Sequence, residues 1–143
     1  NTKKGFAEIW NAPRDGNTQI PEEPIDTIVF PDESFVSLSW SSDSYFLAIG
    51  DINGEIHLWN SINHEIQTFQ AHEGIVVSLA WSPDGMKMAS VSDADDTVRI
   101  WDTTSYEQLA TIPVNDVSSL TWNPDGTLIA MAHKDGTIRV WSE

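Results

Sequence analysis

Cysteine is absent from the 143-residue sequence, and basic residues are scarce. Without cysteine these residues form neither disulfides nor cysteine-based zinc sites, which fits a reducing compartment such as the cytoplasm. Only 7 Lys and Arg oppose 22 Asp and Glu, so the net charge is −15 at pH 7. Such a surface repels phosphates, which argues against nucleic acid and anionic membrane surfaces as partners. A protein or peptide, above all a basic one, is the partner that this field favours, although acidity can also serve solubility alone.

Long apolar runs and catalytic motifs are missing as well. No stretch approaches the roughly 18 apolar residues of a membrane helix, and no apolar segment follows Lys3 and Lys4 as it would in a signal peptide. The sequence contains no nucleophile elbow, phosphate-binding loop or dinucleotide-binding glycine motif. We therefore expect no enzyme activity within these residues and no cofactor.

Tryptophan, in contrast, is abundant and regularly spaced. The chain has seven Trp, and six of them fall into two interleaved series. One series has a spacing of 41 residues, and the other has spacings of 42 and 40 residues; their members are Trp40, Trp81 and Trp122, and Trp59, Trp101 and Trp141. Two series with one common period indicate a repeated supersecondary unit.

Each repeat shows the same order of strand and turn patterns. Apolar and polar residues alternate over 35–40, 76–81 and 117–122, which is typical of strands. Tight turns follow, two of them with the sequence Pro-Asp-Gly, in which proline presets φ and glycine permits a positive φ. Second strands are predicted at 45–50, 86–91 and 128–132, third strands at 55–59, 97–101 and 137–141, and short fourth strands at 65–69 and 108–112.

Four short antiparallel strands in about 41 residues, with a Trp-Asp pair at Trp101 and Asp102, resemble the repeats of the WD-repeat β-propeller family. The resemblance is strong over 35–143. It is weaker before residue 35, where 5–11 and 25–30 look like a third and a fourth strand, and 12–24 like a solvated insertion loop. It implies an all-β fold made of β-propeller blades of four antiparallel strands, in an incomplete ring. We expect a single partial propeller, with a partial blade at 1–34, blades at 35–74 and 75–115, and a three-stranded blade at 116–143.

A propeller typically has about 4–8 blades, and this chain begins at Asn1 rather than at Met. We therefore expect that the chain is cut from a longer propeller. Two alternatives remain open. Copies of the chain could complete one another, with the strand at 25–30 filling the last blade of the next copy, or another chain could supply the missing blades.

In this family a His before the first strand, a Ser or Thr on the second strand, an Asp in the next turn and the Trp of the third strand form a hydrogen-bonded tetrad. The resemblance implies that His72, Ser90, Asp95 and Trp101 form this tetrad in the middle repeat. A buried indole N–H needs an acceptor and a turn Asp needs donors, so we interpret the four residues as structural and not catalytic. The other two repeats depart from the pattern, because neither has the His, the first has Asn53 for Asp, and the third has Met131 near the Ser position.

No metal site is expected. The turns at 51–55 and 93–96 contain oxygen ligands, but they lack the ligand spacing and the distal Glu of a calcium loop. The four His are not spaced like metal ligands. We expect His57 to be half-exposed on its strand and His133 to be solvated at its turn.

The resemblance also implies where partners bind. In this family the loops from fourth to first strand and from second to third strand gather on one face, which is the usual partner surface. Here these loops are acidic, and Lys134 is their lone base. The candidate partner-binding residues are Asp32, Glu33, Asp51, Glu73, Asp93, Asp96, Asp116, His133 and Lys134. We expect an interaction scaffold, with two alternatives: a self-assembling, oligomeric propeller with a structural role, or the regulatory or sensor part of a larger enzyme.

Overall fold

The computed structural model describes residues 5–11, 23–30 and 34–142. These residues form strands and turns, with no helix among them, as the sequence predicted. The chain divides into two compact units, Asn1–Ser34 and Phe35–Glu143. Most of the expected insertion loop at 12–24 lies outside the described residues.

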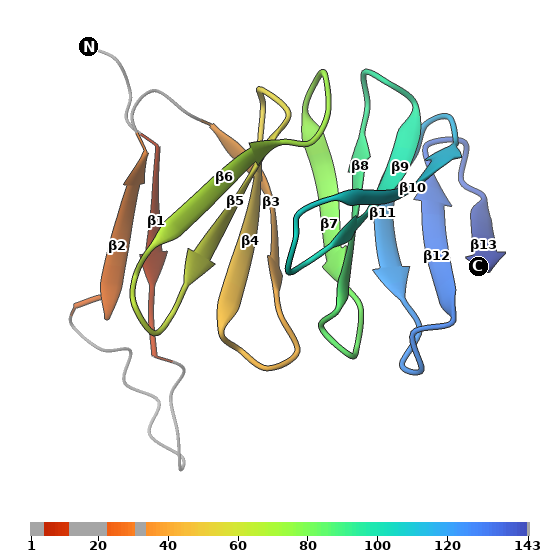
Figure 1. Cartoon of the computed structure of the whole chain (residues 1–143). Helices are drawn as coiled ribbons and strands as arrows, with labels where there is room; N and C mark the ends of the chain where they lie inside the picture. Colours follow the sequence, from red (N-terminus) through yellow and green to blue (C-terminus); the bar gives the residue numbers. More distant parts are fainter. Residues whose placement is uncertain (1–4, 12–22, 31–33, 143) are drawn as a thin grey trace, which may run out of the picture. The chain divides into compact units, whose positions relative to one another are not determined.

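The first unit contains one antiparallel strand pair (Figure 1). Strand β1 (Gly5–Ile9) pairs with β2 (Asp26–Phe30), with Gly5 opposite Phe30 and Ile9 opposite Asp26. Both strands were predicted, β1 as a third strand within 5–11 and β2 as a fourth strand within 25–30. Ile28 of β2 is buried.

The second unit contains three antiparallel sheets in which the strands pair in chain order. Figure 1 shows these three sheets side by side, without closure into a ring. The first sheet consists of β3 (Phe35–Trp40), β4 (Phe46–Asp51), β5 (Glu55–Asn60) and β6 (Ile66–Gln70). The second consists of β7 (Val76–Trp81), β8 (Lys87–Ser92), β9 (Thr97–Asp102) and β10 (Gln108–Pro113). The third consists of β11 (Val117–Trp122), β12 (Leu128–His133) and β13 (Ile138–Ser142). The first strands have the predicted bounds, and β4 and β8 begin and end one residue later than predicted.

The repeat extends to the hydrogen-bond register. In all three sheets the pairing of the first and second strands shifts by one residue near its start, between Phe35 and Ser37, between Val76 and Ser78, and between Val117 and Ser119. A bulge of this kind bends the strand and increases its twist. The same irregularity at the same place in three sheets shows that the sequence repeat encodes the shape of each sheet.

The turns between first and second strands follow from their residue types. Gly85 and Gly126 have φ of +74° and +73°, a region that glycine enters without steric cost. The carboxylate of Asp84 accepts hydrogen bonds from the hydroxyl of Ser82 at 2.6 Å and from the amide of Met86 at 2.9 Å. The first sheet has no glycine here, and Ser44 takes the positive φ of 65° instead.

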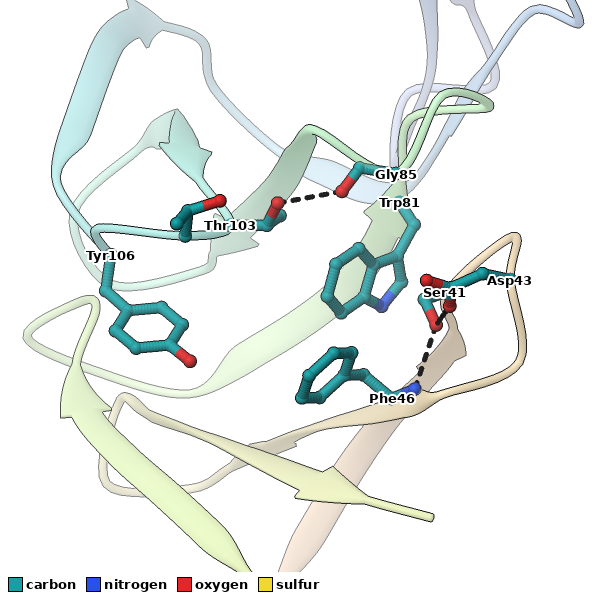
Figure 2. A pocket seen from close by; sticks show the side chains of 8 residues that line it. Ser41, Asp43, Phe46, Trp81, Gly85, Thr103 and Tyr106 are labelled. Atoms are coloured by element: carbon teal, nitrogen blue, oxygen red, sulfur yellow. Dashed lines mark hydrogen bonds between the residues drawn. The ribbon is translucent and has the colours of Figure 1, made fainter. Parts of the chain in front are cut away.

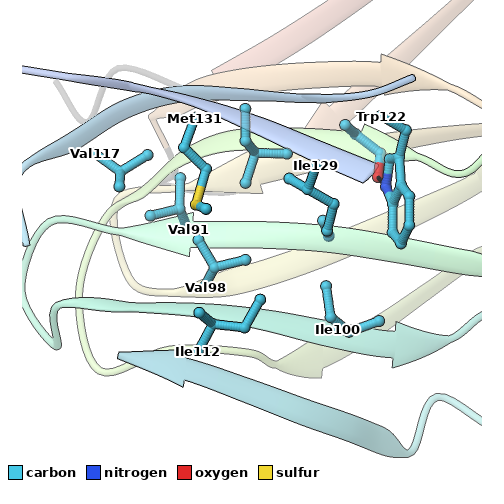
Figure 3. Packing of buried hydrophobic residues seen from close by; sticks show 11 residues of the cluster. Val91, Val98, Ile100, Ile112, Val117, Trp122, Ile129 and Met131 are labelled. Carbon is cyan, nitrogen blue, oxygen red and sulfur yellow. Dashed lines mark hydrogen bonds between the residues drawn. The ribbon is translucent and has the colours of Figure 1, made fainter. Parts of the chain in front are cut away.

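Apolar side chains fill the spaces between neighbouring sheets of the second unit. Figure 3 shows the cluster between the second and third sheets, in which Val98 and Ile100 of β9 face Ile129 and Met131 of β12. A second cluster joins the first and second sheets, with Leu58 of the first among its residues. The middle sheet packs on both faces, and five of the six residues of its central strand β8 are buried.

The Trp residues that end the first strands link one sheet to the next. The indole N–H of Trp81 donates to the carbonyl of Ser39 at 3.0 Å, and that of Trp122 donates to the carbonyl of Ala80 at 3.2 Å. Each bond runs from the first strand of one sheet to the first strand of the preceding sheet. These bonds hold each sheet against the preceding one. The Trp residues of this series therefore recur once in every sheet.

Candidate functional site

The second sheet brings the four residues of the expected tetrad together. His72 lies in the loop before β7, Ser90 on β8, Asp95 in the turn after β8 and Trp101 on β9. Nδ1 of His72 lies 2.8 Å from Oδ2 of Asp95, and Nε2 lies 2.8 Å from the hydroxyl oxygen of Ser90. The indole N–H of Trp101 donates to the same hydroxyl oxygen at 2.8 Å. The network connects both central strands of the sheet to the loops at one edge.

Donor chemistry assigns the protons in this network. The indole nitrogen of Trp101 can only donate, so the hydroxyl of Ser90 accepts from it and donates its own proton to Nε2 of His72. Nδ1 of His72 then carries the proton that is donated to Asp95. Burial lowers the pKa of His72 below its ordinary value, although the hydrogen bond to Asp95 acts in the opposite direction. The neutral imidazole is therefore the form that the folded chain favours.

Arg99 is a further member of the network that motif reasoning missed. Its guanidinium donates to Oδ2 of Asp95 at 3.1 Å and to the carbonyl of Ala71 at 2.8 Å. Burial raises the pKa of Asp95, but hydrogen bonds from Thr97 and His72 and the Arg99 charge outweigh it, so the pKa lies below its ordinary value. The signal for Arg99 was its place two residues before Trp101 on β9, which puts both side chains on one face.

The first sheet has a different buried network at its corresponding edge. Nδ1 of His57 lies 2.8 Å from the hydroxyl of Thr68, and Nε2 lies 3.5 Å from Oδ2 of Asp51. Oδ1 of Asp51 accepts the backbone N–H groups of Asn53 and Glu55 at 2.9 and 2.8 Å. This corrects two expectations, because His57 is 2% exposed instead of half-exposed, and Asp51 is 0% exposed and cannot contact a partner. The interior of the sheet accepts both side chains because each polar atom has a partner within it.

The same residues bring possible metal ligands together. One ligand atom each of Asp51, Glu55 and His57 lie within 4.8 Å of one another. Sequence spacing did not indicate this set, because the register of β4 and β5 creates it. Both oxygens of Asp51 already receive hydrogen bonds, Oδ1 from two backbone amides and Oδ2 from the amide of Asn53 at 3.4 Å. The arrangement therefore serves first as a structural network.

The third sheet corrects the expectation for His133. Its side chain is buried, 5% exposed, where a solvated and partner-binding residue was expected. Nδ1 lies 2.8 Å from the carbonyl of Asn115, and Nε2 is buried without a hydrogen-bond partner among the described residues. His133 is the last residue of β12 and lies opposite Val117 of β11. Asp135 in the next turn is exposed and bonds to the hydroxyl and amide of Thr137 at 2.6 and 2.8 Å.

The remaining candidate partner-binding residues that the structure describes occupy the connections at one edge of the three sheets (Figure 1). Asp32 and Glu33 lie outside the described residues. Five others are exposed: Glu73, Asp93, Asp96, Asp116 and Lys134. Their turns are held by backbone bonds, since the amide of Val114 donates to the carbonyl of Asp96 at 2.9 Å and the amide of Lys134 donates to that of Asp116 at 2.7 Å. We call the four exposed carboxylates Glu73, Asp93, Asp96 and Asp116 the acidic edge.

The described part of the chain contains no helix with the length and hydrophobicity that a membrane crossing requires.

Comparison with known families identifies three repeats. The family described as "WD domain, G-beta repeat" (WD40) matches residues 23–60, 63–102 and 106–142, which make up more than half of the chain. Each matched segment begins with the last strand of one sheet and ends with the third strand of the next, so that the second contains β6 to β9. The repeat in the sequence is therefore offset by one strand from the sheets.

Three curated relatives show similar stretches. "Protein HIR1" of Cryptococcus neoformans and "WD repeat-containing protein 1" of Xenopus tropicalis are each 32% identical, over 107 and 111 residues. "THO complex subunit 3" of Arabidopsis thaliana is 24% identical over 110 residues. The matches cover 68%, 73% and 73% of this chain but 12%, 18% and 35% of the relatives. The chain thus spans a minor part of the length of each.

Proposed function

Since this chain belongs to the WD40 repeat family, we propose that it is a protein-interaction scaffold that binds a basic protein or peptide at the acidic edge. WD-repeat proteins typically act in protein interactions and complexes, and they are generally scaffolds without catalytic activity. One relative, THO complex subunit 3, is by its name a subunit of a complex. The absence of cysteine supports a reducing intracellular setting for this scaffold.

The observation that carries the proposal is the exposure of the acidic edge. Its four carboxylates come from three successive connections, the loop before β7, the turn after β8 and the loop before β11. Lys134 is the only candidate residue of opposite sign at this edge. Since the whole chain carries a net charge of −15, the local field adds to a field of the same sign.

Charge of this kind affects binding in a defined way. It steers an approaching cationic partner and rejects anionic ones, and its contribution to the association rate exceeds its contribution to affinity. Rigid turns reduce the ordering cost of binding. The backbone hydrogen bonds at Asp96 and Asp116 therefore support a preformed docking surface.

The test uses fluorescein-labelled octalysine and two variants with equal changes in net charge. The test variant combines Glu73→Lys with Asp93→Lys, which avoids Asp96 and Asp116 because their φ of 50° and 56° would strain a lysine. The control variant combines Glu8→Lys with Glu23→Lys, both exposed in the first unit.

We expect slower association of octalysine with the test variant than with the control at low salt, and a smaller difference at about 0.15 M ionic strength. Stopped-flow fluorescence anisotropy measures both rates. Equal rates for the two variants would show that only net charge matters, and the acidic edge would then have no role as a docking surface.

A further inference from the structure

A pocket of about 340 Å³ opens at the opposite edge of the second unit, between the first and second sheets. Its volume lies in the range of pockets that bind small groups. The turns after β3, β7 and β9 contribute to it. Its lining includes Ser41, Asp43, Phe46, Trp81, Thr103 and Tyr106.

Three aromatic rings border this pocket and are held in place by their own contacts. Figure 2 shows Phe46, Trp81 and Tyr106 around a common space. The rings of Phe46 and Trp81 are stacked, with centroids 6.2 Å apart, and the indole N–H of Trp81 donates to a carbonyl of β3. The ring of Tyr106 stacks on Phe69 at 5.7 Å. The rings therefore need little rearrangement to receive a ligand.

A carboxylate stands at the border of the same pocket. Oδ1 of Asp43 accepts the hydroxyl of Ser41 at 2.6 Å and the amide of Tyr45 at 2.9 Å. The hydrogen bond from Ser41, followed by that from Tyr45, holds the pKa of Asp43 below its ordinary value. Asp43 is thus ionised at neutral pH. Its second oxygen, Oδ2, receives no hydrogen bond from the described residues and is available to a ligand.

Acidic residues predominate around the pocket, although the charge of Lys87 acts on the carboxylate of Asp84. Asp84 and Asp102 lie next to the lining residues Gly85 and Thr103 in the chain. Hydrogen bonds lower their pKa values too, from Ser82 to Asp84 and from the backbone of Ser105 to Asp102. No basic residue is among the eight that line the pocket in the described part of the chain. An anion would be repelled here, and a neutral apolar group would form no ion pair with the carboxylate of Asp43.

We propose that this pocket binds a basic side chain, lysine or arginine, of a partner protein. The cation would lie against the faces of Trp81, Phe46 or Tyr106, an attraction that the ring quadrupoles provide, and would pair with Asp43. The apolar stem of the side chain would contact the rings. This site lies at the edge opposite the acidic edge and does not depend on it.

The test uses three single amino-acid probes, the N-acetyl N-methylamides of lysine, arginine and norleucine. Norleucine keeps the apolar stem and lacks the charge. NMR follows the indole N–H of Trp81, assigned by its loss in Trp81→Phe. We expect saturable shifts with lysine and arginine and none with norleucine at the same concentration. Equal shifts with norleucine, or no shift with either cation, would overturn the proposal.

Two variants locate the cation. Asp43→Asn preserves the shape of the turn, and Asp125→Asn is its matched control, because Asp125 occupies the same position in the third sheet and accepts the amide of Thr127 at 3.0 Å. We expect the affinity for the lysine probe to fall roughly threefold in Asp43→Asn and to stay unchanged in Asp125→Asn. Equal effects in both variants, including none in either, would contradict a role of Asp43.

Tyr106→Leu removes a ring and keeps apolar bulk. We expect the affinity to fall roughly fivefold. An unchanged affinity would exclude the ring from the site. Because the lysine and arginine probes carry one charge each and binding is followed at Trp81, the outcome is separate from octalysine binding at the acidic edge.

Discussion

The indole nitrogen of Trp101 lies 2.8 Å from the hydroxyl oxygen of Ser90, which lies at the same distance from Nε2 of His72. One small side chain therefore satisfies two buried nitrogen atoms from different parts of the second sheet. Leaving a buried donor or acceptor without a partner costs more than the net value of one hydrogen bond. This relationship makes Ser90 a sensitive position for stability.

Replacing Ser90 with alanine would leave the indole N–H of Trp101 and Nε2 of His72 without a partner. We expect a loss of about 2–4 kcal/mol in the free energy of unfolding, measured by urea denaturation. Ser118→Ala is the matched control, since Ser118 is exposed and makes one hydrogen bond, to the carbonyl of Ala132. Its expected loss is about 1 kcal/mol or less. Equal losses would show that the network contributes nothing beyond an ordinary hydrogen bond.

Acid should destabilise the chain through His72. Burial lowers its pKa from the ordinary value of 6.5, so the unfolded chain binds the proton more readily than the folded chain. The contribution of His72 to stability is then fully present above the pKa that His72 has in the unfolded chain, and it decreases as the pH falls below that value. We expect the free energy of unfolding of His72→Gln to fall less than that of the unchanged chain as the pH is lowered from about 7 to about 5. Identical slopes in urea denaturation over this range would show that His72 does not carry the effect.

Asp51 and Asp93 provide a matched test of buried against exposed carboxylates. Asp51 is buried and accepts two backbone amides, whereas Asp93 is exposed in the corresponding turn of the second sheet. We expect Asp51→Ala to lower the free energy of unfolding by about 2–4 kcal/mol, and Asp93→Ala to change it by about 0.5 kcal/mol or less. Thermal and urea denaturation measure both. A small effect at Asp51 would contradict its structural role.

Gly54 and Gly136 separate backbone strain from steric conflict. Both have a positive φ, +86° and +85°. A methyl group on Gly54 would collide with the carbonyl oxygen of His72, while one on Gly136 would meet nothing within 4 Å. We expect Gly136→Ala to cost about 1 kcal/mol from strain alone, and Gly54→Ala to cost about 3 kcal/mol or more. Similar costs, measured by urea denaturation, would mean that the loop before β7 can move away.

Local patterns predicted most of the fold. Alternating residues marked the strands, Pro-Asp-Gly marked two turns, and the Trp period marked the repeat, because each of these depends on residues close in the chain. The motif also named the four residues that the structure brings together around Ser90. The motif does not include Arg99, which joins the network through Asp95 and the carbonyl of Ala71.

The sequence by itself determined the strands, their order and their repetition, and only the tertiary structure decided which polar residues are buried. Alternation predicts one solvated face for each strand, but a sheet between two others is covered on both faces, and five consecutive residues of β8 in the second sheet are buried. Asp51, His57 and His133 were expected at the surface, but they are buried and form hydrogen bonds within the chain. The pocket beside Trp81 likewise depends on three turns that meet only when neighbouring sheets pack.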